Sequence, residues 1–300
     1  MDNTDKVESG KPDTGRKYSG FDRNLLSTGV TSFLTDTSVK IIYSVMPMFL
    51  LSLGASKTSI ALIEGIAEST ASVFKVISGF WSDKIGKNKP FMLIGYGLSS
   101  LILPLYSFVV NPLQVLAIRF TERIGKGIRT APRDSLIAAS ATDGASGKSF
   151  GLQKAMDNSG AIVGPLVSFG LLSAFPDNYR LILILAGIPS FIAIFVIIFG
   201  IREVRKNKND LIRKFNFRDF SPRFYIFLLI IFIFTLGNST DALLLVKAGE
   251  SGIKVAYIPL VYMVTSIVSV IMAIPLGSLS DRKGKEIILE IGRASCRERV

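Results

Sequence analysis

The sequence of 300 residues contains no histidine and only one cysteine, Cys296. Imidazole and thiolate groups are the main protein ligands of zinc, so the body of the chain offers no such site and no thiol nucleophile. We therefore expect neither a metal nor a cofactor. With histidine absent, carboxylates are the side chains left to take up and release protons near neutral pH.

Apolar residues dominate the composition, at 49% of the chain. Eight apolar runs follow a polar amino-terminal stretch, and runs of about 20 residues are long enough for helices that cross a bilayer. The sequence therefore predicts an all-α, polytopic membrane protein embedded in lipid. The predicted helices cover residues 25–52, 58–81, 90–110, 113–131, 149–174, 179–200, 223–247 and 255–277.

The formal net charge of +12 does not indicate nucleic-acid binding, because lysine and arginine gather in the gaps between apolar runs. They concentrate in alternate gaps, 82–89, 132–148 and 201–222, whereas the intervening gaps hold few. Basic loops stay on the cytoplasmic side of a membrane. We expect a multi-pass protein of the cell membrane (inner or plasma membrane) with its amino terminus in the cytoplasm.

The pattern of apolar and polar stretches divides the chain into five parts. We predict a disordered cytoplasmic tail over 1–24, a six-helix amino-terminal bundle over 25–200 and a basic cytoplasmic linker over 201–222. Residues 223–290 are predicted to form two helices of a second bundle. Residues 291–300 resemble the translation of a sequencing adapter, so we expect a non-native tail on a truncated chain; a natural basic tail is the alternative.

A nine-residue pattern occurs twice, as Gly79-Phe-Trp-Ser-Asp-Lys-Ile-Gly-Lys87 and as Gly277-Ser-Leu-Ser-Asp-Arg-Lys-Gly-Lys285. Each copy follows a long apolar run, and the copies are 198 positions apart (277 − 79). That spacing accommodates six membrane-spanning helices. Such a repeat indicates a transporter built from two similar halves.

Ionisable side chains inside the predicted helices are candidates for function, because a charge in a spanning helix is unfavourable unless it faces a bundle interior or water. The second helix carries Glu64 and Glu68 four residues apart, and we expect one of them to be a protonation site. The predicted pathway for substrate and protons comprises Asp36, Lys40, Glu64, Glu68, Arg119, Glu122 and Asp157. For neighbouring opposite charges, mutual neutralisation is the alternative. Arg129 and Arg133 are predicted to be cytoplasmic anchors.

These motifs resemble those of the major facilitator superfamily. The first copy of the repeated pattern is similar to that family's signature between helices two and three, and the second copy to its degenerate counterpart between helices eight and nine. The stretch from Arg119 to Asp134 resembles the fourth-helix motif, with Glu122 and Arg123 where a Gln-Gly pair is common. Gly160-Ala-Ile-Val-Gly-Pro165 is similar to the antiporter motif of the fifth helix.

The resemblance implies a bundle of twelve helices, of which eight are present. It also implies that Arg119 takes part in proton coupling. The residues implied in conformational gating are Gly79, Asp83, Gly86, Lys87, Arg123, Gly160, Gly164, Pro165, Gly277, Asp281 and Gly284.

The function implied is secondary active transport of a small organic solute by alternating access, with proton-coupled efflux as the leading mode. A proton symporter or uniporter for a nutrient is the alternative. A membrane-embedded enzyme is disfavoured, because the sequence shows no nucleophile or metal-binding set. We expect a monomer when the chain is complete, with protons and a small molecule as its partners.

Overall fold

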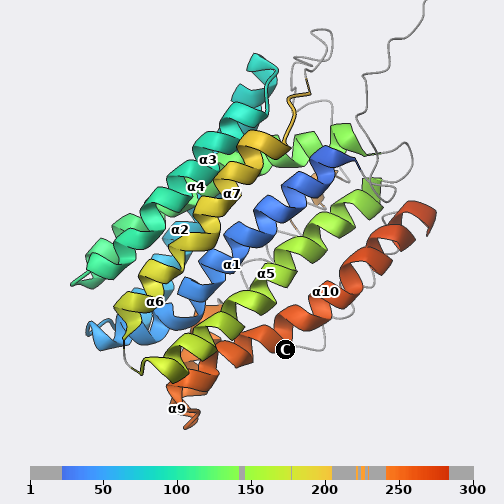
Figure 1. Ribbon diagram of the computed structural model, residues 1–300. Helices are drawn as coiled ribbons and strands as arrows, with labels where there is room; N and C mark the ends of the chain where they lie inside the picture. The colour runs from blue at the N-terminus through green and yellow to red at the C-terminus, as the bar shows by residue number, and fades with distance from the viewer. Residues whose placement is uncertain are drawn as a thin grey trace, which may run out of the picture.

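The computed structural model of the chain describes residues 22–141, 146–176, 178–204 and 241–283, with residues 221, 224–226 and 229. All regular structure within these residues is helical (Figure 1), which confirms the predicted all-α class. The amino-terminal tail, most of the basic linker, the first part of the seventh predicted helix and the stretch from 284 to 300 lie outside the described residues.

The helices follow the predicted apolar runs closely. The elements are α1 (Arg23–Ser52), α2 (Lys57–Ile85), α3 (Lys89–Ile102) with the 3-10 turn η1 (Leu103–Phe108), α4 (Pro112–Ser140), α5 (Ser146–Ala174), α6 (Tyr179–Leu185), α7 (Gly187–Gly200), α9 (Asp241–Glu250), the 3-10 turn η4 (Val255–Tyr257) and α10 (Ile258–Lys283). Among the described residues, three stretches are long and apolar enough to cross a membrane: Arg23–Ser52, Lys89–Phe108 and Tyr179–Gly200. The helices α2 and α4 are similarly long but carry more charge, as expected of helices that line an interior.

Local sequence signals account for the ends of α2. The Ser56 hydroxyl accepts a hydrogen bond from the Ser59 amide at 3.1 Å and so caps the amino terminus. Gly86 ends the helix with φ of 72°, in the left-handed region that glycine adopts without a steric penalty. Gly86 therefore sets the turn that leads into α3.

The sixth predicted helix is interrupted between α6 and α7. The Ser38 hydroxyl of α1 donates to the Ala186 carbonyl and accepts from the Ser190 amide at 3.0 Å. These are the two backbone groups that an uninterrupted helix would join to each other. A side chain inserted into the helical hydrogen-bond ladder is a recognised cause of a break.

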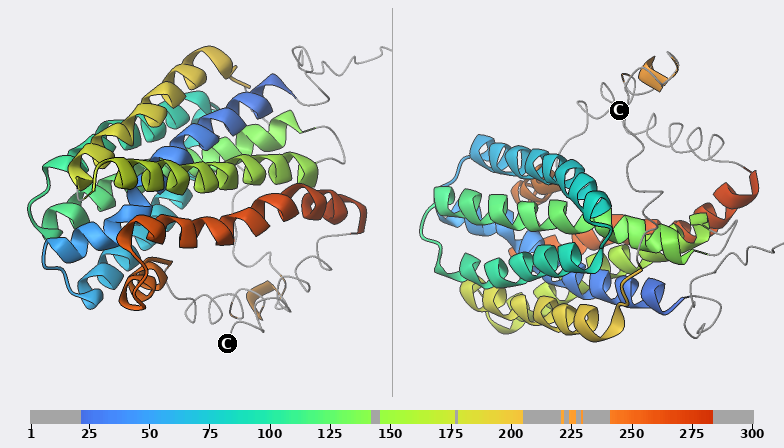
Figure 2. Two further views of the ribbon diagram at one scale, coloured as in Figure 1. Left: turned by 60° about the horizontal axis from the view of Figure 1, so that its bottom comes forward. Right: turned by 90° about the horizontal axis from the view of Figure 1, so that it is seen from above.

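The helix α1 lies inside the bundle, with α5 and α7 packed along it (Figure 1). The helix α10 packs along the opposite side of α5, and α4 lies between α2 and α3 (Figure 2). Close approach of α5 to α1 depends on Gly160, where an added Cβ would lie 2.7 Å from the Phe33 carbonyl oxygen. Small residues at this position of α5 thus allow the two backbones to approach closely.

The apolar core is centred on α1. Ile42 and Val45 are buried there against Ile182 of α6, Val115 of α4 and Leu245 of α9. Further along the same helices the buried residues become polar and charged. The bundle thus has an apolar end, and next to it a region of buried charge that forms the candidate site.

Candidate functional site: a charged cavity in the bundle

A cavity of about 350 Å³ lies among α1, α2, α4, α5 and α10. Its positions on α4 recur every three or four residues from Glu122 to Arg133, because one face of that helix points into it. The charged residues that line it are Asp36, Lys40, Glu68, Glu122, Arg123, Lys126, Arg129, Arg133, Lys154 and Asp157. It therefore brings together five of the seven residues predicted for the pathway.

The other two predicted residues, Glu64 and Arg119, form a buried ion pair beside the cavity. Arg119 is 1% exposed, and its Nε and Nη2 donate to the two oxygens of Glu64 at 3.1 and 3.0 Å. Its Nη1 donates to Glu122 Oε2 at 3.0 Å. Such a two-point pairing between arginine and carboxylate fixes both side chains in orientation as well as in charge.

Arg123 extends this network toward the cavity. Its Nη1 lies 2.9 Å from Glu68 Oε1, and its Nη2 lies 4.0 Å from Glu64 Oε2. The Lys126 ammonium is 3.8 Å from Glu68. Three cations of α4 and three carboxylates thus cancel in charge, which keeps the burial of so many ionised groups tolerable.

Glu64 and Glu68 differ sharply in their surroundings. The Glu64 side chain is 7% exposed and is held by Arg119, whereas the Glu68 side chain is 58% exposed. Glu68 therefore has access to water in the cavity, which a group that exchanges protons requires.

A second cluster joins α1, α4 and α5. The Arg133 Nη1 lies 3.5 Å from Asp157 Oδ2 and donates to the Ser32 hydroxyl at 3.2 Å. Gln153 donates to the other oxygen of Asp157 at 2.8 Å, and Arg133 also pairs with Asp134 at 3.1 Å. Asp157 is thus held between its own helix and α4.

The interpretation of Arg129 and Arg133 as anchors at the membrane surface is wrong. The helix α4 continues to Ser140 instead of ending near 131, so both side chains lie inside the bundle and line the cavity. Arg129 is buried, donates to the Ser99 hydroxyl at 2.7 Å and stacks over the Tyr96 ring at 4.4 Å. Both arginines follow Glu122 at a spacing of three to four residues, through Lys126, and this helical spacing could have placed them on the same face of α4.

Lys40 connects the cavity to α10. Its ammonium lies 5.0 Å from the ring centre of Tyr43 and 4.6 Å from that of Tyr262, whose hydroxyl it also contacts. Tyr262 belongs to the second predicted half of the protein and was missed from the sequence. Asp36, one turn before Lys40 on α1, lies in the same wall of the cavity.

Arg123, one of the predicted gating residues, lines the cavity. The other gating residues fall into three places: α2 with the turn that follows it, α5 and α10. Gly79 faces α4, where an added Cβ would lie 3.3 Å from the Ala131 Cβ. Asp83 lies exposed in the last turn of α2, and Lys87 lies exposed in the turn to α3. The α5 residues Gly160, Gly164 and Pro165 are buried, and Gly164 faces α1. Gly277 and Asp281 belong to α10, and Gly284 lies outside the described residues.

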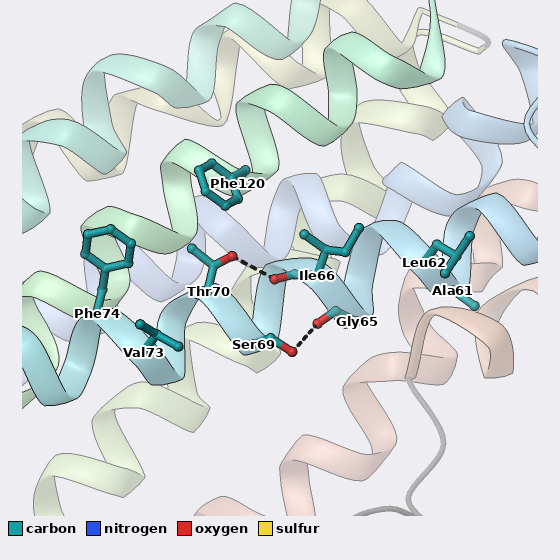
Figure 3. Close-up of a pocket in the computed structure, with 9 residues that line it drawn as sticks. All are labelled: Ala61, Leu62, Gly65, Ile66, Ser69, Thr70, Val73, Phe74 and Phe120. Carbon is teal, nitrogen blue, oxygen red and sulfur yellow. Dashed lines mark hydrogen bonds between the residues drawn. The ribbon is translucent and has the colours of Figure 1, made fainter.

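A larger groove of about 620 Å³ lies on the outer side of α2 and α4 (Figure 3). None of its nine described lining residues is charged. Its hydroxyl groups are already satisfied, since Ser69 and Thr70 donate to the carbonyls of Gly65 and Ile66 at 2.9 and 2.8 Å (Figure 3). This apolar surface suits contact with lipid or with another helix better than recognition of a polar solute.

Comparison with known proteins decides the family. A family profile described as Major Facilitator Superfamily matches residues 28–296. The chain belongs to the major facilitator superfamily. This confirms the family predicted from the repeated motif, and it indicates a transporter that is integral to the membrane rather than an enzyme.

Two curated protein sequences are similar to the chain. The chain is 32% identical to the uncharacterized MFS-type transporter MJ1317 of Methanocaldococcus jannaschii, over 90% of the chain and 69% of that protein. It is 26% identical to the multidrug resistance protein MdtG of Klebsiella pneumoniae, over 57% of the chain and 42% of that protein.

Solved superfamily structures share the fold. A bacterial homolog of the human lysosomal transporter Spinster, inward-facing and unoccupied, matches with a TM-score of 0.59 and 16% identity, over 85% of the chain and 59% of that structure. A POT family transporter in complex with 5-aminolevulinic acid matches with a TM-score of 0.56 and 16% identity, over 81% of the chain and 50% of that structure. The chain thus spans between 42% and 69% of the lengths of these four proteins.

Proposed function

We propose that the protein is a secondary active transporter that moves a small organic solute across the cell membrane by alternating access, with proton-coupled efflux as its mode. The supporting observation is the cavity of about 350 Å³, whose wall joins charged groups of α1, α2, α4 and α5 to Tyr262 of α10. A binding site between two predicted halves, lined by ionisable groups, is the arrangement that alternating access requires. The similarity to a relative named for multidrug resistance supports efflux.

Glu68 is the proposed proton carrier. Its carboxylate is accessible from the cavity and pairs with Arg123 at 2.9 Å across the contact between α2 and α4. Protonation removes the charge that holds these side chains together, so it weakens one contact between the two helices. Glu64 is assigned a different role, because its two oxygens are occupied by Arg119; the pair orients Arg119 beside the carrier.

The test is transport into everted membrane vesicles that carry an imposed proton gradient, acidic inside. Because the chain spans only part of the length of its relatives, the assay uses the protein as it is encoded in the genome. The first solute is norfloxacin, a small fluorescent compound. We expect accumulation that collapses when an uncoupler removes the gradient, and its loss in Glu68→Gln.

A matched variant separates proton transfer from folding. Glu64 lies one helical turn from Glu68. The substitution Glu64→Gln breaks the buried pair with Arg119, so we expect it to lower the free energy of unfolding by about 3–5 kcal/mol. Glu68→Gln should fold as the wild type does. Unchanged proton coupling in Glu68→Gln would contradict the assignment of Glu68 as the proton carrier. Accumulation only with the opposite gradient would indicate symport in place of antiport.

A further inference from the structure

The wall of the charged cavity carries more cations than carboxylates. Among the described residues that line it, six are basic and four acidic, an excess of two positive charges (6 − 4). The basic residues are Lys40, Arg123, Lys126, Arg129, Arg133 and Lys154. In a cleft with walls of low dielectric constant, such an excess raises the local concentration of anions.

Two of the six cations lie outside the ion pairs of the cavity wall. Arg123 and Lys126 pair with Glu68, and Arg133 pairs with Asp157. In the described part of the chain, Arg129 and Lys154 form no ion pair. They come from α4 and α5, on two sides of the same cavity.

The Arg129 guanidinium is held in a fixed orientation that suits the binding of an anion. Its guanidinium donates to the Ser99 hydroxyl at 2.7 Å and rests on the Tyr96 ring at 4.4 Å, two contacts that hold its plane fixed. A guanidinium has five donors and no acceptor, and Ser99 accepts from one nitrogen only. A fixed, planar and charged donor group matches the two oxygens of a carboxylate or a phosphate.

We propose that Arg129, assisted by Lys154, binds an anionic group of the transported solute, a carboxylate or a phosphate. This rests on the proposed function for the identity of the cavity as the solute site. Arg129 lies six residues beyond Arg123, about 9 Å along α4. The anion and the proton carrier Glu68 therefore occupy different parts of the cavity, and recognition of the anion is separable from proton coupling.

The experiment measures the ligand-induced rise in melting temperature of the protein as it is encoded in the genome, purified in detergent at low salt, where no proton gradient exists. The probes are benzoate, phenyl phosphate, benzamide and benzylamine, which share a ring and differ in charge. We expect benzoate or phenyl phosphate to raise the melting temperature at millimolar concentration, and the neutral and cationic probes to have no effect. Comparison of the two anions distinguishes a carboxylate from a phosphate.

Three variants locate the binding group. Arg129→Gln should weaken the response to the anion by about tenfold, the usual scale for loss of one charged hydrogen bond. Lys154→Gln should weaken it in the same direction, and because Lys154 is exposed this variant keeps the test valid if Arg129→Gln folds poorly. Lys57→Gln removes one exposed positive charge outside the cavity and should respond as the wild type does.

The proposal is overturned if no anion stabilises the protein at millimolar concentration, or if benzylamine stabilises it more than benzoate. It is also overturned if the Lys154 and Arg129 variants bind the anion as the wild type does. Because no gradient is used, any of these outcomes leaves proton-coupled transport to be judged by the vesicle assay.

Discussion

Two glutamates one turn apart on α2 show how position decides the behaviour of identical residues. Glu64 is buried against Arg119, whereas Glu68 faces the cavity and pairs with Arg123 from an exposed position. Removing the charge of a buried partner leaves the other ion uncompensated, which is far more costly than loss of an exposed pair. The same carboxylate group is therefore held rigidly at one position and is accessible to water four residues later.

The close packing at Gly160 gives a prediction for a single residue. An added Cβ would lie 2.7 Å from the Phe33 carbonyl oxygen and 2.8 Å from the Thr37 amide nitrogen of α1, so Gly160→Ala must push α5 away. We expect a loss of about 1–3 kcal/mol, as for other overpacked sites. Gly170→Ala on the same helix meets nothing within 4 Å and should be neutral or stabilising. Thermal unfolding in detergent measures both, and equal melting temperatures would contradict the packing of α5 on α1.

The sequence was sufficient to place the charges on their helices but not to pair them. A period of 3.6 residues assigns Glu64 and Glu68 to one face of α2, and that assignment is independent of the neighbouring helices. Which of the two meets Arg119 depends on how α2 crosses α4, which the sequence of neither helix determines. The contact of Lys40 with Tyr262 likewise depends on the packing of α10, so it was found only in the structure.

At the scale of elements, α3 and α7 satisfy each other's ends. The Glu203 carboxylate accepts from the Asn88 and Lys89 amides at 2.8 and 3.0 Å, at the amino terminus of α3. The Lys89 ammonium in turn donates to the carbonyls of Ile198 and Ile201 at 2.8 Å, at the carboxyl terminus of α7. These are the unpaired groups at helix ends, and each receives the charge that the helix dipole favours.

Glu203→Ala should therefore loosen the start of α3. The Asn88 side chain makes no capping hydrogen bond. Among the described residues, no other side chain would therefore accept from the Asn88 and Lys89 amides once the Glu203 carboxylate is removed. We expect a loss of about 1–2 kcal/mol and faster hydrogen exchange in the peptide from 87 to 93. Glu250→Gln removes a carboxylate that pairs with Lys57 at α2 and α9, and its exchange pattern over 87–93 should match the wild type. Unchanged exchange in Glu203→Ala would show that the cap does not hold α3.

At the scale of the whole molecule, α2 is long enough to place its two ends on opposite sides of a membrane. The helix has 29 residues and is about 43 Å long, more than the hydrocarbon thickness of about 30 Å. Lys57 lies at its start and Lys87 lies just past its end, both exposed. The excess of lysine and arginine in alternate loops predicts that the Lys87 end lies in the cytoplasm.

That orientation is tested with single cysteines in a cysteine-free background of the same genome-encoded protein. Lys57→Cys should react with a membrane-impermeant maleimide in intact cells, whereas Lys87→Cys should react only after the membrane is opened. Each variant is the control for the other, because both sites are exposed and lie at opposite ends of one helix. The reverse pattern would place the amino terminus outside and would contradict the orientation predicted from the basic loops. The labelling experiment thus tests which side of the membrane each end of α2 faces, and the vesicle assay independently tests the direction of transport.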